Sequence, residues 1–185
     1  MIKPIIITIL IVHFLLGCAT YRADSITLLQ QNFDEGIAAY QIGNYKQAFN
    51  KWLPLAKRGH TASAFRIADM YDFAQGVSQD YAQAARWYLD AARRGHGESQ
   101  CRIAGRYTDG LGISRDIIES YKWSWLCFQS EDASETAKYW ADIYMRAIFS
   151  VGVLSYEEIK YVEELAKSWK PKPRLRLNTD VINRK

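Results

Sequence analysis

Residues 61–96 read TASAFRIADMYDFAQGVSQDYAQAARWYLDAARRGH, and residues 97–132 read GESQCRIAGRYTDGLGISRDIIESYKWSWLCFQSED. The second stretch repeats the first with an offset of 36 positions, which aligns Tyr71 with Tyr107, Asp80 with Asp116, and Trp87 with Trp123. A period of roughly 20 to 50 residues is typical of solenoids, in which each unit buries its apolar face against its neighbours. The repeat therefore predicts an all-α stack of helix pairs, and function in such a protein usually means binding.

Helix boundaries recur with the same spacing. Three side chains suited to an N-cap are each followed three residues later by Gln or Glu, which is the pattern of a capping box. These pairs are Asn44 with Gln47, Asp80 with Gln83, and Asp116 with Glu119. Each pair is expected to start the second helix of a unit. Two units end in basic residues followed by Gly59-His60 or Gly95-His96, and glycine after a basic last turn predicts a helix C-cap.

The recurring residues resemble the Sel1-like repeat, a relative of the tetratricopeptide repeat with a longer loop between its helices. The pattern is carried in phase by small, aromatic and capping residues: Ile67-Ala68, Tyr71, Gly76-Val77, Asp80, Ala84, Trp87, Ala91-Ala92 and Gly95-His96. The resemblance implies an α/α right-handed superhelix of about eight helices that works as a protein-interaction module. Two residues depart from the family pattern, Ala74 where the family prefers glycine and Ser120 where it prefers alanine.

The repeat pattern divides the rest of the chain. Residues 26–60 are expected to form a first tetratricopeptide-like helix pair, and residues 133–169 a C-terminal helix pair that caps the last repeat. Pro171 and Pro173 then end the helix. Residues 170–185 carry six cations against Asp180, a net charge of 6 − 1 = +5, and are expected to form a basic, disordered tail. Binding of a partner or of an anionic lipid surface is the alternative for this tail.

The N-terminus has the features of a bacterial export signal. One cation, Lys3, precedes an apolar run over residues 5–16, which is too short to span a bilayer but suits a signal peptide. The residues Leu15-Leu16-Gly17-Cys18 resemble a lipobox, so we expect residues 1–17 to be cleaved, Cys18 to be acylated with palmitate and other fatty acids, and residues 18–25 to form a tether. An ordinary secretory signal is the alternative. Ala19 is not the aspartate that retains lipoproteins in the inner membrane, which favours the periplasmic face of a bacterial outer membrane.

The remaining cysteines, Cys101 and Cys127, both lie in the second repeat. Cys101 falls early in one expected helix and Cys127 late in its antiparallel partner, so the two thiols can meet across the pair. The equivalent positions one repeat earlier hold Phe65 and Ala91, a large residue facing a small one. An exported protein can form disulfides. Two reduced cysteines in the core are the alternative.

Catalytic and metal-binding patterns are lacking in the sequence after the leader. The histidines there are His60 and His96, and both belong to repeat turns without a third ligand in the same element, so we expect no metal site. No nucleophile or phosphate-binding motif accompanies them, which predicts that the protein is not an enzyme and has no cofactor. Some secreted, cysteine-rich relatives are reported to bind β-lactams, but their cysteine spacing and an acylation motif are missing. Lys and Arg total 24 against 20 Asp and Glu, a balance that does not indicate nucleic acid.

A solenoid offers its concave wall as a binding surface, since the outward positions of its first helices align in rows. The predicted partner-binding residues are Arg66, Met70 and Phe73 in one repeat and Arg102, Arg106 and Asp109 in the next. Met, aromatic residues and Arg are enriched at protein interfaces. Packing of Met70 and Phe73 against the neighbouring unit is the alternative.

These features predict a monomeric, lipid-anchored adaptor or inhibitor that binds another periplasmic protein. The resemblance also implies a sharper hypothesis, because short secreted members of the family act as immunity proteins that neutralise an antibacterial effector, such as a phospholipase. Scaffolding or regulation of cell-envelope enzymes is the alternative.

Overall fold

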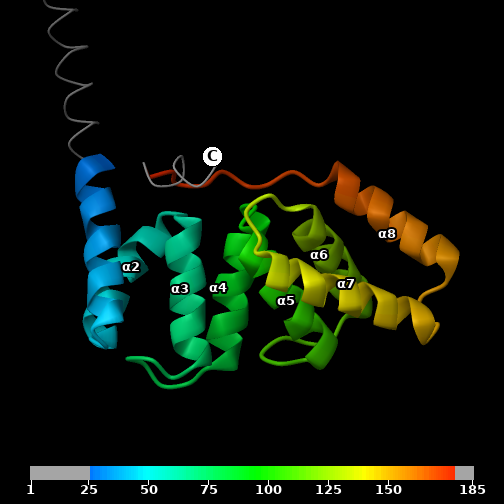
Figure 1. Cartoon of the computed structure of the whole chain (residues 1–185), viewed down its shortest axis with the longest axis horizontal. Helices are drawn as coiled ribbons and strands as arrows, with labels where there is room; N and C mark the ends of the chain where they lie inside the picture. The colour runs from blue at the N-terminus through cyan, green and yellow to red at the C-terminus, as the bar shows by residue number, and fades with distance from the viewer. Residues whose placement is uncertain (1–25, 178–185) are drawn as a thin grey trace, which may run out of the picture.

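The computed structural model describes residues 26–177, which form eight α-helices and contain no β-strand (Figure 1). A helix over residues 26–41 comes first. It is followed by α2 (Tyr45–Lys57), α3 (Thr61–Asp72), α4 (Tyr81–Arg93), α5 (Gly97–Asp109), α6 (Ile117–Gln129), α7 (Glu135–Ser150) and α8 (Tyr156–Ser168). From α2 to α7 each helix packs against the next, so the predicted all-α solenoid is confirmed. Within the described residues, no helix is long and apolar enough to cross a bilayer.

The N-caps that the sequence predicts start the second helix of each of the first three pairs. The side chains of Asn44, Asp80 and Asp116 accept hydrogen bonds from the backbone N–H groups three residues later. The Glu119 side chain does not accept a hydrogen bond from the backbone N–H of the N-cap residue. It accepts hydrogen bonds from Trp123 Nε1 and Lys122 instead. A reciprocal capping box forms at α8, between Ser155 and Glu158. The three N-caps are therefore as expected, and among the helices α2 to α8 the reciprocal box is found at α8.

Glycines in the long inter-helix loops allow adjacent repeats to stack closely. Gly76 and Gly112 both have positive φ, at 73° and 77°. A Cβ atom on Gly112 would lie 1.9 Å from the carbonyl oxygen of Tyr81, and one on Gly76 would lie 2.7 Å from the carbonyl carbon of Tyr45. Each loop thus contacts the first residue of the second helix in the preceding unit. Only glycine satisfies both the backbone conformation and the lack of space.

The two departures from the family pattern have local consequences. Ala74 adopts a φ of +55°, whereas its equivalent one repeat later is Gly110, at +72°. A left-handed conformation costs an alanine about 1–2 kcal/mol, so Ala74 is a strained position. Ser120 is fully buried, and its hydroxyl forms a 2.6 Å hydrogen bond with the hydroxyl of Thr108. The Thr108 hydroxyl also donates to the Ala104 carbonyl at 3.2 Å, so the buried serine adds a second hydrogen bond to this group and links α6 to α5.

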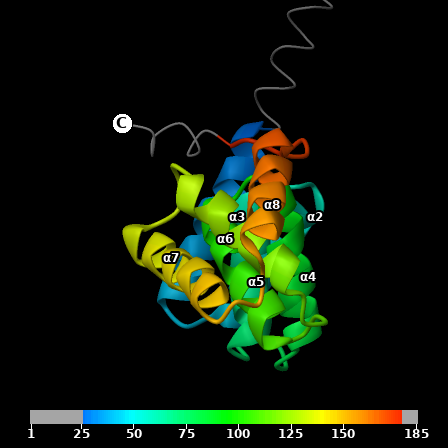
Figure 2. The same ribbon diagram turned by 90° about the vertical axis from the view of Figure 1, so that its right-hand side faces the viewer.

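The last two helices both pack on α6, as expected of helices that cap the last repeat, but they do not pack along each other like the earlier pairs. Helix α7 packs on α6 and also contacts α5, whereas α8 packs on α6 from another side (Figure 2). The two helices meet near their turn, where Ile148, Leu154 and Val162 share one buried cluster. Beyond the turn the two helices diverge, and each of them packs on α6. Helix α7 therefore reaches over α5 rather than merely continuing the stack.

Residues 170–177 of the C-terminal segment pack on the solenoid, whereas the charge of this segment predicts a disordered tail. It runs back across the helix ends toward the first unit (Figure 1). The Lys172 N–H donates to the Arg93 carbonyl at 2.8 Å, and the Leu175 N–H donates to the Gly59 carbonyl at 3.1 Å. Leu177 is 2% exposed and belongs to the core cluster of the first helices. We call residues 170–177 the strap. Residues 178–185, like the expected leader and tether over 1–25, lie outside the described residues.

Candidate functional site

The residues predicted to line the concave wall differ in their exposure to solvent. Arg66 on α3, its C-cap residue Phe73, and Arg102 and Asp109 on α5 are exposed. Met70 is fully buried in the core cluster of the first helices, with Ile67 and Ala91, so it cannot contact a partner. Helical spacing does not distinguish a concave row from a row that faces the preceding unit, and Met70 belongs to the second kind. Packing against the neighbouring unit, the alternative for this residue, is the observed one.

Arg106 is a structural residue rather than a free binding residue. Its guanidinium forms an ion pair with Asp72 of α3, and the Asp72 side chain is only 5% exposed. The same guanidinium lies 5.7 Å from the centre of the Tyr81 ring and 5.8 Å from that of Tyr88, distances suited to cation–π contacts. Arg106 therefore ties α5 to α3 and α4. Reversing its charge would place a carboxylate beside Asp72, so we expect that change to destabilise the fold, and it is unsuitable as a test of binding.

Two more side chains complete the polar cluster between these helices. The Tyr88 hydroxyl donates to Asp69 Oδ1 at 2.5 Å and lies 3.4 Å from Asp72 Oδ2. Burial raises the pKa of Asp69, although the hydrogen bond from Tyr88 opposes this change. Burial, and next the charge of Asp69, raise the pKa of the Tyr88 hydroxyl, which therefore remains a donor. The cluster fastens one repeat to the next, and nothing in it resembles a nucleophile with its base.

An open pocket of about 530 Å³ lies between α5 and α7. Helix α5 contributes Arg102, Gly105 and Asp109 to its lining, and α7 contributes Trp140 and Tyr144. The Trp140 side chain is 53% exposed and available to a ligand. With Arg106 and Glu98, which also line it, the pocket combines two cations, two carboxylates and two amphipathic aromatic rings, a composition that suits a polypeptide partner. We call it the α5–α7 groove.

The groove exists because the second repeat lacks the polar cluster of the first. Gly105 occupies the position of Asp69, and Ser124 that of Tyr88. A Cβ atom on Gly105 would lie 3.3 Å from the Tyr144 hydroxyl oxygen, so the missing side chain makes room for α7. A glycine inside a helix costs about 1 kcal/mol relative to alanine and usually marks a close approach. Gly105 was therefore a signal in the sequence for a close contact with a later helix, which the structure identifies as the contact with Tyr144.

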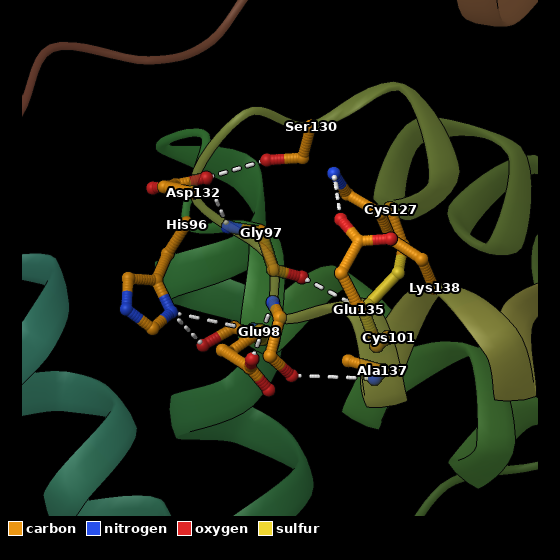
Figure 3. The surroundings of a disulfide bond; sticks show 12 residues. His96, Gly97, Glu98, Cys101, Cys127, Ser130, Asp132, Glu135, Ala137 and Lys138 are labelled. Carbon is orange, nitrogen blue, oxygen red and sulfur yellow. Dashed lines mark hydrogen bonds and ion pairs between the residues drawn. A yellow bond between two sulfur atoms is a disulfide. The ribbon is translucent and has the colours of Figure 1, made fainter. Parts of the chain in front are cut away.

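A disulfide between Cys101 of α5 and Cys127 of α6 stabilises the base of this groove (Figure 3). The Cα atoms are 5.2 Å apart, so the predicted pairing is confirmed. Next to the bridge, the Gly97 N–H donates to Asp132 at 3.1 Å, and the Ser134 N–H donates to Glu98 at 2.7 Å. These bonds attach the turn before α7 to the start of α5. They position α7, and with it the aromatic wall of the groove.

The two histidines of the repeat turns are N-caps, a role that the sequence pattern did not identify. His60 Nδ1 accepts a hydrogen bond from the Ser63 N–H, and His96 Nδ1 accepts one from the Ser99 N–H. Each ring nitrogen also lies within 2.8 Å of the hydroxyl of the same serine. Over residues 26–177, no group of three or more His, Cys, Asp or Glu side chains is placed to hold a metal ion.

Acidification is expected to destabilise the fold through His96. Burial lowers the pKa of His96 from 6.5 to about 4, although the charges of Asp132 and Glu98 oppose this change. The folded state therefore binds fewer protons than the unfolded state between these values, so stability is complete above pH 6.5 and is lost as the pH falls toward 4. The difference of 6.5 − 4 = 2.5 pKa units limits the loss to about 3 kcal/mol, and we expect about 1–3 kcal/mol.

The measurement is urea unfolding at a series of pH values, with His96→Asn as the matched variant. Asparagine is a good N-cap and does not titrate in this range. The variant is expected to lose less stability than the native protein on acidification through this window. An identical pH dependence in both proteins would contradict the assignment to His96.

Stacked helix hairpins with an open groove on one wall define this protein as an α-helical solenoid of the kind used for contacts with other macromolecules. Residues 61–96 and 97–124 match the Sel1 repeat. The chain therefore contains two Sel1 repeats, and Sel1 repeats generally mediate protein–protein interactions. A search of curated protein sequences finds no significant match.

Two solved structures share the fold. A protective antigen of uropathogenic Escherichia coli strains, which displays an SLR fold, superposes with a TM-score of 0.63 at 17% identity, over 81% of this chain and 34% of that one. A Sel1 repeat protein from Oxalobacter formigenes superposes with a TM-score of 0.56 at 25% identity, over 75% of this chain and 56% of that one. The present chain thus spans about a third of the first protein and just over half of the second.

Proposed function

We propose that the protein is a non-catalytic interaction module, an adaptor or inhibitor, and that the α5–α7 groove binds a segment of its protein partner. The observation that supports the proposal is the composition of the groove, which Arg102 and Asp109 line together with the exposed ring of Trp140. Interface residues that contribute most to affinity are enriched in Trp, Tyr and Arg. Phe73 and Arg66, exposed on the neighbouring first helix, extend the surface.

We further propose that the module is anchored by lipid at the periplasmic face of a bacterial outer membrane. The support is the sequence before residue 26, where Leu15-Leu16-Gly17-Cys18 has the pattern of a lipobox. More than one acyl chain is needed for stable anchoring, and a lipoprotein cysteine carries several. Incorporation of labelled palmitate tests this part, because a Cys18→Ala variant should remain unlabelled.

Within this role, neutralisation of an antibacterial effector such as a phospholipase is the hypothesis that we favour. Its test is deletion of the gene followed by challenge with sibling cells that deliver effectors. Unchanged survival would exclude immunity without excluding binding. The second candidate is a scaffold or regulator of cell-envelope enzymes, for which the captured partners would be synthases or hydrolases. β-Lactam binding is the least favoured, and we expect labelled penicillin not to bind.

The groove assignment predicts a loss of affinity in a double variant. Affinity capture with the acyl-free chain from residue 19 onward, followed by mass spectrometry, would identify the partner. Arg102→Gln combined with Trp140→Ala is then expected to raise the Kd by about 30-fold or more, because truncation of a central Trp typically costs at least about 2 kcal/mol. Isothermal titration calorimetry with the purified partner measures this change.

The matched control is Lys160→Gln combined with Tyr161→Ala on α8. This pair also removes one exposed cation and one exposed aromatic ring, since Tyr161 is 65% exposed, but it lies outside the groove. The control should keep the native Kd. Equal affinity of both double variants would place the binding surface elsewhere.

A further inference from the structure

The strap gives one edge of the molecule a concentrated positive charge. Three of its cations, Lys170, Lys172 and Arg176, are exposed, and none of them forms an ion pair among the described residues. The helix ends that the strap crosses add three more exposed cations, which are Lys57, Arg58 and Arg93. These six residues, the strap-face cations, come from three distant parts of the sequence.

Two open pockets border the strap, and cations dominate both. The first, about 330 Å³, is lined by Arg93, Lys122, Lys170 and Lys172 together with three aromatic side chains. Glu119 is its one carboxylate, and this group already pairs with Lys122 and accepts from Trp123. The second pocket, about 510 Å³, is lined by residues 94–95 and by residues 171–174 and 176, and it contains no carboxylate. Oxyanions such as phosphate would be attracted to both pockets.

The carboxylates near this edge do not neutralise the strap-face cations. Asp90 pairs with Arg94, which also donates to the Pro173 carbonyl. Glu98, Glu131 and Asp132 line an adjoining polar pocket with Arg174, so Arg174 is not counted among the strap-face cations. On α8, Glu164 pairs with Lys167. The positive charge of the strap face therefore remains available to a ligand.

The position of the strap indicates what that ligand is. The strap and the start of the helix over 26–41 lie at the same edge of the solenoid, the upper edge in Figure 1. The proposed lipid anchor at Cys18 precedes this helix by eight residues, 18–25, which reach at most about 25–29 Å when fully extended. An anchor attached at that edge would bring the strap face, rather than the groove, toward the membrane surface.

We propose that the strap face binds the phosphate headgroups of an anionic phospholipid membrane and so orients the solenoid with its groove away from the lipid. The proposal rests on the proposed lipid anchor for its geometry, but the charge of the strap face does not depend on acylation. Juxtamembrane Lys and Arg residues are attracted to anionic leaflets, and salt weakens this attraction. Anchor and strap would together act as a two-point attachment.

Vesicle sedimentation of the chain from residue 19 onward tests the strap without the anchor. This chain retains every described residue. We expect it to sediment with vesicles of phosphatidylcholine and phosphatidylglycerol, to remain soluble with phosphatidylcholine alone, and to be released by about 0.5 M salt. Lys170→Gln, Lys172→Gln and Arg176→Gln together should lower the partition coefficient on the order of a hundredfold, since each cation contributes about 1 kcal/mol near such a surface.

The matched control removes three exposed cations elsewhere, by Lys46→Gln, Arg86→Gln and Arg115→Gln, and should bind like the native chain. The hydrogen bonds that hold the strap use backbone groups of Lys172 and Leu175, so the strap variant should also keep the native unfolding temperature. Equal binding of both triple variants, or displacement of the chain from vesicles by millimolar inorganic phosphate, would overturn the membrane assignment. Failure of palmitate labelling would overturn the anchor and the orientation that depends on it, but not the binding of the strap face to anionic lipid.

Discussion

Gly112→Ala is expected to lower the free energy of unfolding by about 2–5 kcal/mol. The left-handed φ of 77° costs an alanine about 1–2 kcal/mol, and forcing a methyl group into occupied space costs about 1–3 kcal/mol more. The space is occupied by backbone, since the new Cβ atom would lie 1.9 Å from the Tyr81 carbonyl oxygen and 2.9 Å from the Ala82 nitrogen. Backbone cannot turn away as a flexible side chain can, so the loop or the repeat interface must shift. Chemical denaturation followed by circular dichroism measures the loss.

Gly43→Ala is the matched control for this change. Gly43 has nearly the same φ, 78°, but nothing lies within 4 Å of the position of its Cβ atom. The control therefore carries the conformational cost without the collision and should lose about 1–2 kcal/mol. A similar loss in both variants would show that backbone conformation, rather than contact between repeats, explains the glycine of the loop.

Reduction of the Cys101–Cys127 disulfide is expected to destabilise the protein by about 3–4 kcal/mol. The bridge connects residues 26 positions apart, and closing a loop of that length lowers the entropy of the unfolded chain by a corresponding amount. The melting temperature should fall by roughly 6–16 °C in a chain of this size. Because the bridge lies beside the turn that attaches α7 to α5, reduction should also weaken binding at the groove.

Thermal unfolding of the chain from residue 19 onward, with and without a thiol reductant, measures this effect. The control is Cys101→Ala combined with Cys127→Ala, where the first repeat shows that alanine fits the second position, since its equivalent is Ala91. The double variant should unfold at a low temperature that the reductant does not change. If reductant left the native protein unaffected as well, the two thiols would not be bridged under the conditions of the measurement.

The sequence alone predicted the repeating framework of the fold. The offset of 36 positions identified the helix pairs, and Asn44, Asp80 and Asp116 marked the start of each second helix. Comparison of Cys101 and Cys127 with Phe65 and Ala91 predicted that the thiols face each other. These features could be read because each depends on local backbone geometry or on a contact within a single helix pair. Such contacts recur with every repeat, so the pattern itself reports them.

The tertiary structure alone decided which side chains remain free and where the last segments lie. Met70 faces the preceding unit and Arg106 pairs with Asp72. Helical spacing alone had placed both residues among the exposed positions of the concave wall. Helix α7 leans over α5 and creates the groove, and the strap returns to bury Leu177 among the first helices. These contacts join parts of the chain that do not repeat and that lie far apart in sequence. Their energies depend on how whole units meet in space, and no periodicity along the chain records that arrangement.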